Sequence, residues 1–334
     1  MRKGLLMNWY KLAKVGWFIG CTVACLLSSA RADDLTDRDV LWRQNAFLCA
    51  IASPTFPSKE IVGQPLDCDD GDMTLFNGLL CAAGESEGCD AVARSQGTNG
   101  RWWRSPRRIG WEAPAYDVSF SPDQSLGVLL YSVQTGDAVR FSRWLSWLEA
   151  NRPCLAKVGG TCVQLGWLRF CTDDPDKRCT LRPADCVRIE EVARKLSVDG
   201  TLCRRIMREL HMPEDVLLPL GEFLIGAATV DDPGYPQHLV GVDIMLARRL
   251  DVDLSKVDQA AAILFGRTSD NAFFRYLYEG ATQEVKADAL TTCPAPDRLS
   301  INRFQWTWER ETKANSWAES MYWECIFLGD LLRQ

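Results

Sequence analysis

Histidine is almost absent from this sequence, because only His211 and His238 occur among 334 residues. That scarcity nearly excludes zinc or iron sites built from several histidines, and it makes Ser-His-Asp catalysis depend on one of two residues. Neither histidine lies in a recognisable catalytic motif. We therefore expect any catalytic chemistry of this chain to rest on carboxylates.

Other signals are missing as well. No Gly-x-Ser-x-Gly elbow, P-loop or dinucleotide fingerprint occurs. The absence of a strict repeat of roughly 30–45 residues argues against a helical-repeat solenoid. Alternating strand patterns are scarce, and residues 118–120 and 163–170 are the best candidates. Beyond the amino terminus no apolar stretch is long enough to cross a bilayer, so we expect no membrane span in the mature chain.

The first 32 residues have the features of a secretory signal peptide. Basic residues precede an apolar run over residues 15–27, no acid occurs before Asp33, and Ala30 and Ala32 occupy the two positions that a signal peptidase reads. We expect cleavage after Ala32 and an exported product, periplasmic or extracellular. An uncleaved anchor is the alternative.

Cleavage would change both charge and cysteine content. It removes five of the 38 basic residues and none of the 44 acidic ones, which leaves 33 basic residues and a net charge of −11. A nucleic-acid partner is therefore not expected. It also removes two of the 14 cysteines, and an even set in an exported chain predicts disulfides of unknown pairing. The remaining twelve are Cys49, Cys68, Cys81, Cys89, Cys154, Cys162, Cys171, Cys179, Cys186, Cys203, Cys293 and Cys325.

The mature chain, residues 33–334, is predicted to be a single all-α domain. Some expected helices are apolar on most faces and others are amphipathic, which is typical of inner helices covered by outer ones. The Gly- and Cys-rich segment 153–186 is expected to be a disulfide-stapled loop or small hairpin inserted into this body. A zinc ribbon is disfavoured because no Cys-x-x-Cys pair occurs. The expected helices span residues 35–53, 73–83, 121–133, 137–150, 184–196, 201–210, 214–228, 237–250, 254–265, 271–279, 282–292 and 315–332.

The first candidate cluster is an acidic run just before the helix expected at residue 73. Asp67, Asp69, Asp70 and Asp72 place four carboxylates within six residues, and these repel one another unless they are solvated, hydrogen-bonded, protonated or bound to a cation. Three interpretations remain open: a solvated loop with Asp72 as helix cap, a catalytic or sugar-binding acid at the helix end, or a calcium site. The calcium pattern lacks the remaining EF-hand positions.

The second cluster combines aromatic and basic residues. Arg101, Trp102, Trp103 and Arg104 are followed by Tyr116. Adjacent tryptophans on an extended segment point in opposite directions, so one can pack while the other is displayed for stacking on a sugar. The arginines can clamp an acidic group. The alternative is two core anchors with a solvated basic patch.

Asp123 begins the next apolar helix. Ser121, Pro122, Asp123 and Gln124 form a strong helix start with a capping-box pattern. If this helix neighbours the one that starts after Asp72, both acids and the tryptophan-rich loop meet at one end of the domain.

The third cluster lies near the carboxyl end. Trp306 and Trp308 share a face if the segment is extended, with Glu309 on the other face and Glu319 on the following helix. Either glutamate could enter a cleft, but core packing and capping are the alternatives.

Together these features resemble the (α/α) toroid glycosidases and polysaccharide lyases. The likeness is carried by residues 70–80, 100–106 and 120–130 and by the tryptophan-rich carboxyl end. It implies helical hairpins in a layered, toroid-like barrel. It also implies an exported carbohydrate-active protein, best taken as a glycoside hydrolase acting on an acidic polysaccharide or oligosaccharide.

In a glycosidase of this kind one carboxyl group donates a proton while the other activates water or attacks the sugar. The resemblance assigns these roles to Asp72 and Asp123, with Glu309 as a substitute for either. A lyase would use Tyr116 as acid or base. No cofactor is expected other than calcium at the acidic run, and the rival function is a non-enzymatic helical module that binds a glycan or a protein. The residues expected to bind substrate are Asp70, Arg101, Trp102, Trp103, Arg104, Tyr116, Trp306 and Trp308.

Overall fold

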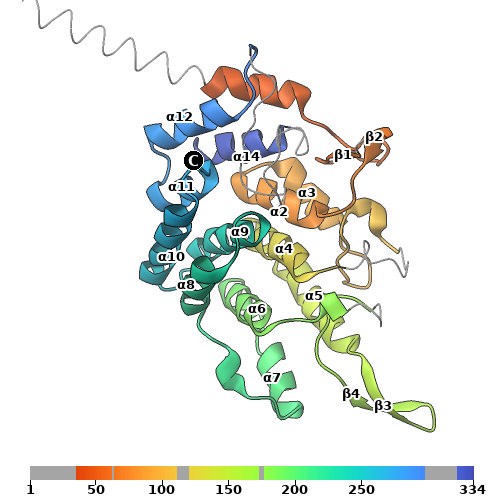
Figure 1. The fold of residues 1–334 in the computed structure, drawn as a ribbon. Coiled ribbons are helices and arrows are strands. Elements are labelled where there is room, and N and C mark those ends of the chain that lie inside the picture. The colour runs from red at the N-terminus through yellow and green to blue at the C-terminus, as the bar shows by residue number, and fades with distance from the viewer. Residues whose placement is uncertain (1–34, 62–63, 111–119, 173–176, 298–321) are drawn as a thin grey trace, which may run out of the picture.

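The computed structural model describes residues 35–61, 64–110, 120–172, 177–297 and 322–334. Within these ranges the chain is mostly helical, as predicted, and its strands form two short antiparallel pairs (Figure 1). The predicted signal peptide lies outside the described residues. So do four predicted site residues, namely Tyr116, Trp306, Trp308 and Glu309.

A helix over residues 35–45 opens the described chain. The helices that follow are α2 (Met73–Ala83), α3 (Ser86–Arg94), α4 (Pro122–Thr135), α5 (Ala138–Ala150), α6 (Pro183–Lys195), α7 (Leu202–Glu209), α8 (Leu220–Val230), α9 (Tyr235–Arg249), α10 (Leu254–Arg267), α11 (Ala272–Glu279), α12 (Gln283–Thr292) and α14 (Trp323–Leu331). Short 3-10 turns are η2 (Pro106–Arg108), η3 (Lys177–Cys179) and η4 (Glu214–Val216), and the strands are β1 (Glu60–Ile61), β2 (Gln64–Cys68), β3 (Cys154–Val158) and β4 (Thr161–Leu165).

Most predicted helices are found, with three differences. The helix expected over residues 35–53 ends at residue 45, and the chain then bends toward Pro54 and Pro57. The helix expected over 214–228 is split, because the turn η4 precedes Pro219 and α8 begins only at residue 220. Helix α3 was not predicted, since only Gly88, Ala91 and Val92 of its nine residues are buried.

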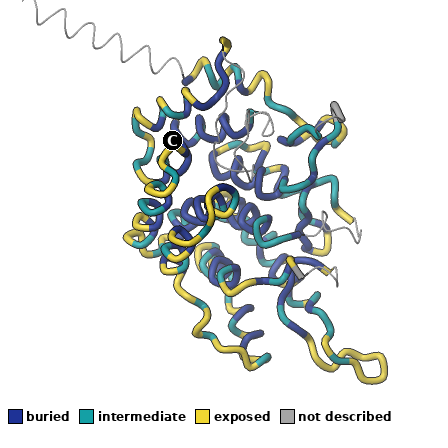
Figure 2. The backbone as a smooth tube through the Cα atoms, in the orientation of Figure 1, coloured by how far each residue is buried: buried dark blue, intermediate teal, exposed yellow. Residues whose placement is uncertain are grey.

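Helices buried on most sides alternate along the chain with helices buried on one side. Every residue of α2 is buried, as are most residues of α4, α9 and α14. Helices α3, α5 and α10, which follow α2, α4 and α9 along the chain, bury only a minority of their residues. Figure 2 shows the buried backbone in the interior and the exposed backbone at the periphery. This agrees with inner helices covered by outer ones.

The helices α2 and α4 approach so closely that glycine is required between them. A Cβ atom on Gly127 would lie 2.0 Å from the carbonyl oxygen of Thr74, and one on Gly78 would lie 2.3 Å from the Cα of Gly127. Neither space can hold a side chain. This contact fixes the amino-terminal ends of both helices, where Asp72 and Asp123 lie, relative to one another.

All twelve cysteines after residue 32 are paired in six disulfides. This confirms the predicted disulfide framework. The bonds are Cys49–Cys68, Cys81–Cys89, Cys154–Cys162, Cys171–Cys179, Cys186–Cys203 and Cys293–Cys325.

The Cys-rich segment has two unlike parts. Strands β3 and β4 form a disulfide-stapled hairpin that projects from the body, and every residue of β4 is exposed (Figure 2). The later part packs into the main core, where Leu168, Phe170 and Leu181 are buried. The disulfides therefore substitute for a core only in the hairpin.

None of the helices in the described part of the chain is long and apolar enough to cross a bilayer.

Candidate functional site

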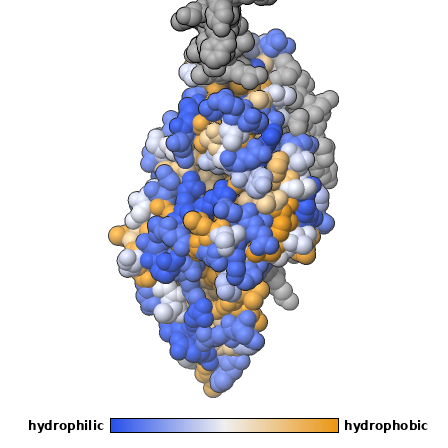
Figure 3. Space-filling view, turned by 90° about the vertical axis from the view of Figure 1, so that its left-hand side faces the viewer, coloured by the Kyte–Doolittle hydropathy of each residue, from blue (hydrophilic) through white to orange (hydrophobic). Residues whose placement is uncertain are grey.

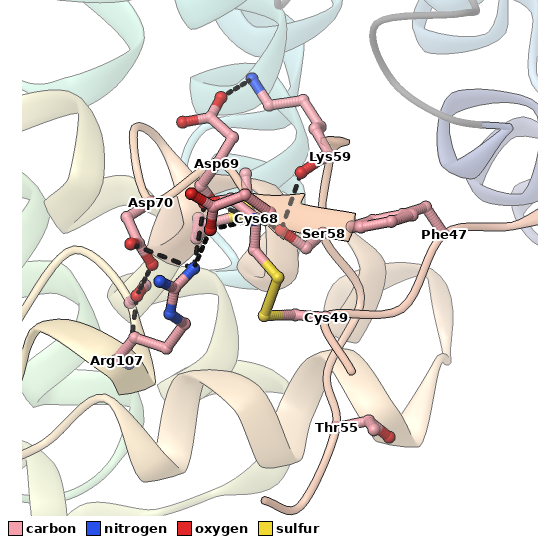
Figure 4. Close-up of a disulfide and its surroundings, with 12 residues drawn as sticks. Phe47, Cys49, Thr55, Ser58, Lys59, Cys68, Asp69, Asp70 and Arg107 are labelled. Atoms are coloured by element: carbon pink, nitrogen blue, oxygen red, sulfur yellow. Dashed lines mark hydrogen bonds and ion pairs between the residues drawn. A yellow bond between two sulfur atoms is a disulfide. The ribbon is translucent and has the colours of Figure 1, made fainter. Parts of the chain in front are cut away.

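The acidic run faces the basic loop that contains η2. Asp70 accepts a hydrogen bond from the hydroxyl of Ser105 and lies 3.1 Å from Nε of Arg108. Arg107 reaches oxygens of Asp67 at 3.4 Å and of Asp70 at 3.5 Å, next to the Cys49–Cys68 disulfide (Figure 4). The two runs that the sequence presents as separate clusters therefore neutralise one another.

The remaining carboxylates of the run also have partners. Oδ2 of Asp69 lies 3.1 Å from Nζ of Lys59, and Oδ1 of Asp69 accepts a hydrogen bond from the backbone amide of Gly71. Burial opposes ionisation of Asp69, but Lys59 and the Gly71 amide outweigh it and lower the pKa of this carboxyl. In the described residues no group of His, Cys, Asp and Glu has an arrangement suited to a metal ion. The calcium site at Asp67, Asp69, Asp70 and Asp72 stays an untested prediction. A calcium ion there would compete with the lysine and arginine side chains that contact these carboxylates.

Asp72 and Asp123 belong to one hydrogen-bonded cluster at the amino-terminal ends of α2, α4 and α9. Asp72 accepts from the side-chain amide of Gln124 at 2.9 Å and lies 3.4 Å from Arg104. Arg104 is also 3.5 Å from the hydroxyl of Ser121, which donates to Asp123. The hydroxyl of Tyr235 donates to the other oxygen of Asp123 at 2.6 Å.

These contacts limit the distance between the two acids. Three successive contacts lead from Asp72 through Arg104 and Ser121 to Asp123, and none is longer than 3.5 Å. The oxygens at the two ends are therefore less than about 10 Å apart, and carboxylate pairs in glycosidases lie roughly 5–5.5 Å or 6.5–9.5 Å apart. The side chains of Asp72 and Arg104 keep 17% and 13% of their surface exposed, so the cluster is open to solvent.

The capping pattern at this end was read wrongly from the sequence. The side chain of Ser121 does not cap α4, and Gln124 turns to Asp72 instead of closing a capping box. Asp72 likewise stands at the cap position of α2 without a side-chain capping bond. All three side chains therefore serve the cluster and not the helix ends.

The tryptophans expected to display a face to sugars are core residues. Trp102 is 1% exposed and packs edge-to-face against Tyr131. Trp103 is 5% exposed, and the guanidinium of Arg101 lies over its ring at 3.9 Å. The prediction that one of the pair is displayed is wrong, because α4 covers one ring and a buried arginine covers the other.

Arg101 is equally unsuited to clamp an acidic sugar. It is 3% exposed, donates to the hydroxyl of Thr172 and lies over Trp147 as well as Trp103. Of the predicted substrate-binding residues in the described part, Arg104 contacts Asp72 directly and is connected to Asp123 through Ser121, while Asp70 contacts the neighbouring arginines. Four other predicted site residues, Tyr116, Trp306, Trp308 and Glu309, fall outside the described residues.

Tyr235 is the member of the cluster that the sequence did not point to. It lies 112 residues from Asp123, and Pro236 follows it at the first turn of α9. A proline also occupies the first turn of α4, where it precedes Asp123, and such a helix-start signal could have related the two.

The two histidines have different surroundings. His238 is fully buried beside Tyr235 and Phe273, and this burial lowers its pKa from 6.5 to about 3. The imidazole is therefore neutral near pH 7 and packs as a core residue. His211 follows the end of α7, far along the chain from the carboxylates, at a positive φ of 55°.

Comparison with protein-family models gave no match, and neither the curated proteins nor the solved structures contain one that matches this chain.

Proposed function

We propose that this chain is an exported glycoside hydrolase in which Asp72 and Asp123 form the catalytic carboxylate pair. The observation that carries the proposal is their separation of less than about 10 Å at a partly exposed cluster, which suits the paired-carboxylate mechanism. Export is supported by the six disulfides, which are typical of oxidising compartments.

The arrangement of the helices supports a toroid-like barrel. The mostly buried helix α2 contacts α14 on one side and α4 on the other, α4 contacts α9, and α9 contacts α11. Active sites of toroid enzymes require side chains from several inner helices to meet at one end. Here α2, α4 and α9 bring Asp72, Asp123 and Tyr235 together at their amino-terminal ends.

The surroundings of the two acids suggest distinct roles. Arg104 beside Asp72 favours the ionised carboxylate, which suits a base or nucleophile. Among the described residues the hydrogen-bond donors to Asp123 are the neutral hydroxyls of Ser121 and Tyr235. We assign Asp123 as proton donor to the leaving sugar and Asp72 as the group that activates water or attacks the anomeric carbon. The buried Trp102 and Trp103 cannot stack on a sugar, so substrate contacts must come from other residues.

β-Elimination is the second candidate reaction. It is favoured by the hydroxyl of Tyr235, which stands in this cluster where Tyr116 had been expected to act. A lyase uses such a hydroxyl as acid or base and an arginine to neutralise a uronate, and Arg104 is connected to Tyr235 through Ser121 and Asp123. This reaction leaves an unsaturated, ultraviolet-absorbing product, whereas hydrolysis leaves a new reducing end.

The test is a screen of the oxidised protein on acidic and neutral polysaccharides for both kinds of product. We expect reducing ends on at least one substrate, and a loss of about a thousandfold or more in both Asp72→Asn and Asp123→Asn. Asp253→Asn is the matched control, because Asp253 also starts a helix but is exposed. Full activity in both cluster variants would refute the site. Binding of a glycan without any product would instead support a non-enzymatic module.

A further inference from the structure

A second site lies on another side of the body, between the start of α6 and the segment that links α7 to α8. It is a hollow of about 300 Å³ lined by seven residues from three parts of the chain. That volume is at the lower end of the range for small-molecule sites, roughly 300–1,000 Å³. The residues are Arg182, Pro183, Ala184, Arg188, Val216, Leu218 and Phe223.

The walls of this hollow are mainly apolar and partly open to water. Val216 and Leu218 are 42% and 52% exposed although they are large aliphatic residues. Val216 ends η4 and Leu218 lies in the short segment that follows it, which Pro219 prevents from continuing as a helix. Figure 3 shows this side of the molecule, where apolar side chains interrupt a largely hydrophilic surface in its lower half. The hollow therefore offers contact to an apolar group of limited size.

One of the two arginines is fully occupied. Arg188 is buried and binds Asp243 through Nε at 2.6 Å and Asp185 through Nη1 at 2.7 Å, while its guanidinium lies 4.9 Å from the ring centre of Phe223. Two carboxylates already balance this cation. It forms a polar wall of the hollow and is not a receptor for a further anion.

The other arginine is exposed. Arg182 lies at the rim, and among the described residues it has no ion pair at hydrogen-bonding distance. The nearby Asp185 carboxyl, whose pKa is raised by burial and lowered by Arg188 and Arg182, is already bound by Arg188. A guanidinium binds a carboxylate through two parallel hydrogen bonds. An apolar hollow with one such cation at its edge matches a molecule that has an apolar body and one carboxylate.

We propose that this hollow binds a small aromatic or branched aliphatic carboxylic acid, with its apolar body against Val216, Leu218 and Phe223 and its carboxylate on Arg182. The occupant is a small molecule because the hollow is too small for a folded partner's surface. It carries one carboxylate because Arg188 is already bound to two carboxylates, whereas the exposed Arg182 has no ion pair among the described residues. This proposal does not depend on the glycosidase assignment.

The probe is 4-fluorophenylacetate, titrated against the oxidised full-length protein and observed by ¹⁹F NMR. We expect saturable binding, and binding at least about fivefold weaker for the neutral 4-fluorophenylacetamide. Glucuronate, which has the charge without the apolar body, should not compete. Equal affinity of acid and amide would overturn the assignment of Arg182, and the absence of saturation would overturn the site.

Two variants at exposed positions separate the two parts of the site without disturbing the fold. Arg182→Gln should weaken the acid about fivefold to tenfold and leave the amide unchanged, whereas Leu218→Ser should weaken both. Arg208→Gln is the matched control, because Arg208 is an exposed arginine of α7 that does not line the hollow. Unchanged affinity for the acid in both variants would refute the proposal. So would concentration-dependent dimerisation that Leu218→Ser abolishes while no probe binds, since the hollow would then serve a second copy of the chain.

Discussion

The helix pair α2–α4 is stabilised by a buried core, whereas the hairpin β3–β4 is stabilised by a disulfide. In the helix pair, buried side chains and a glycine contact bring two backbones together, and every residue of α2 is buried. In the hairpin every residue of β4 is exposed, and Leu155, Val158 and Val163 each exceed half exposure. A core fixes the first, and a disulfide with a Gly159-Gly160 turn holds the second. A site that needs fixed side-chain distances is therefore expected at the helix pair.

The largest effect on stability is expected at the buried ion pairs that join α6 to α9. Replacing Arg188 with Met leaves Asp185 and Asp243 buried without their cation. Burial is the main reason that the pKa of each of these carboxyls is raised even with Arg188 present. We expect a loss of roughly 3–5 kcal/mol in the free energy of unfolding by urea.

Arg194→Met on the same helix is the control, because the Arg194 side chain is 57% exposed in its pair with Glu191 and should contribute less than about 1 kcal/mol. Equal losses in the two variants would show that the buried charges do not hold α6 to α9.

The next effect concerns the glycine contact itself. Gly127→Ala places a Cβ atom 2.0 Å from the Thr74 carbonyl oxygen, so α2 and α4 must separate. We expect a loss of about 3 kcal/mol, seen as a lower melting temperature. In contrast, Gly226→Ala in α8 meets no atom within 4 Å and should stabilise by about 0.5–1 kcal/mol. A stable Gly127→Ala protein would mean that this contact does not set the spacing of the two helices.

A smaller, pH-dependent effect on stability is expected at Asp330 of α14, which contacts Arg43 in the helix of residues 35–45. Burial and the neighbouring Glu85 raise the pKa of Asp330 to about 7, although Arg43 and Arg333 oppose this. Between about pH 4 and pH 7 the folded carboxyl keeps a proton that the unfolded chain has released. Its contribution to stability is therefore full below pH 4 and is lost as the pH rises through 7.

Asp330→Asn removes this titration. We expect the variant to lose about 1 kcal/mol less stability than the natural chain when the pH is raised from about 5 to about 8, measured by urea unfolding at each pH. Asp258→Asn, at an acid that is 66% exposed, should leave the slope unchanged. Identical slopes for Asp330→Asn and the natural chain would contradict the raised pKa.

The smallest effect tests the hairpin, and it uses two disulfides that span equal lengths of chain. Cys81–Cys89 and Cys154–Cys162 each join residues eight apart, so loop-closure entropy is the same for both. Replacing Cys154 and Cys162 with Ser should leave the melting temperature of the body within about 2 °C while making the hairpin sensitive to protease. Replacing Cys81 and Cys89 should lower it, because Cys81 lies in the core. The opposite order would show that the hairpin folds as part of the core.

The sequence predicted the helices well where strong local signals coincide. Gly84 and Gly136 end α2 and α4 in left-handed conformation, as expected for glycine after a helix. The prediction of a helix through residue 53 was wrong because the Cys49–Cys68 disulfide holds the segment after residue 45 in another conformation. Hydrophobic periodicity does not reveal such a bond.

The candidate site was predictable only in part. The carboxylates at the starts of two apolar helices could be found because helix starts have local signatures. The burial of Trp102 and Trp103 could not, since it depends on Tyr131 and on Arg101, whose positions are set by tertiary packing. The pairing of the acidic run with Arg107 and Arg108 was missed for the same reason, although both runs were recognised separately.

The order of the disulfides has a consequence for how the protein is made. In chain order the first of the twelve cysteines is bonded to the second, the third to the fourth, and so on through six successive pairs. Twelve thiols can pair in roughly ten thousand ways. On the proposed export, an oxidase that joins thiols in the order in which they emerge from a translocation channel reaches this one arrangement directly. Folding after export should then need an oxidase but no disulfide isomerase, which the yield from cells that lack the isomerase would measure.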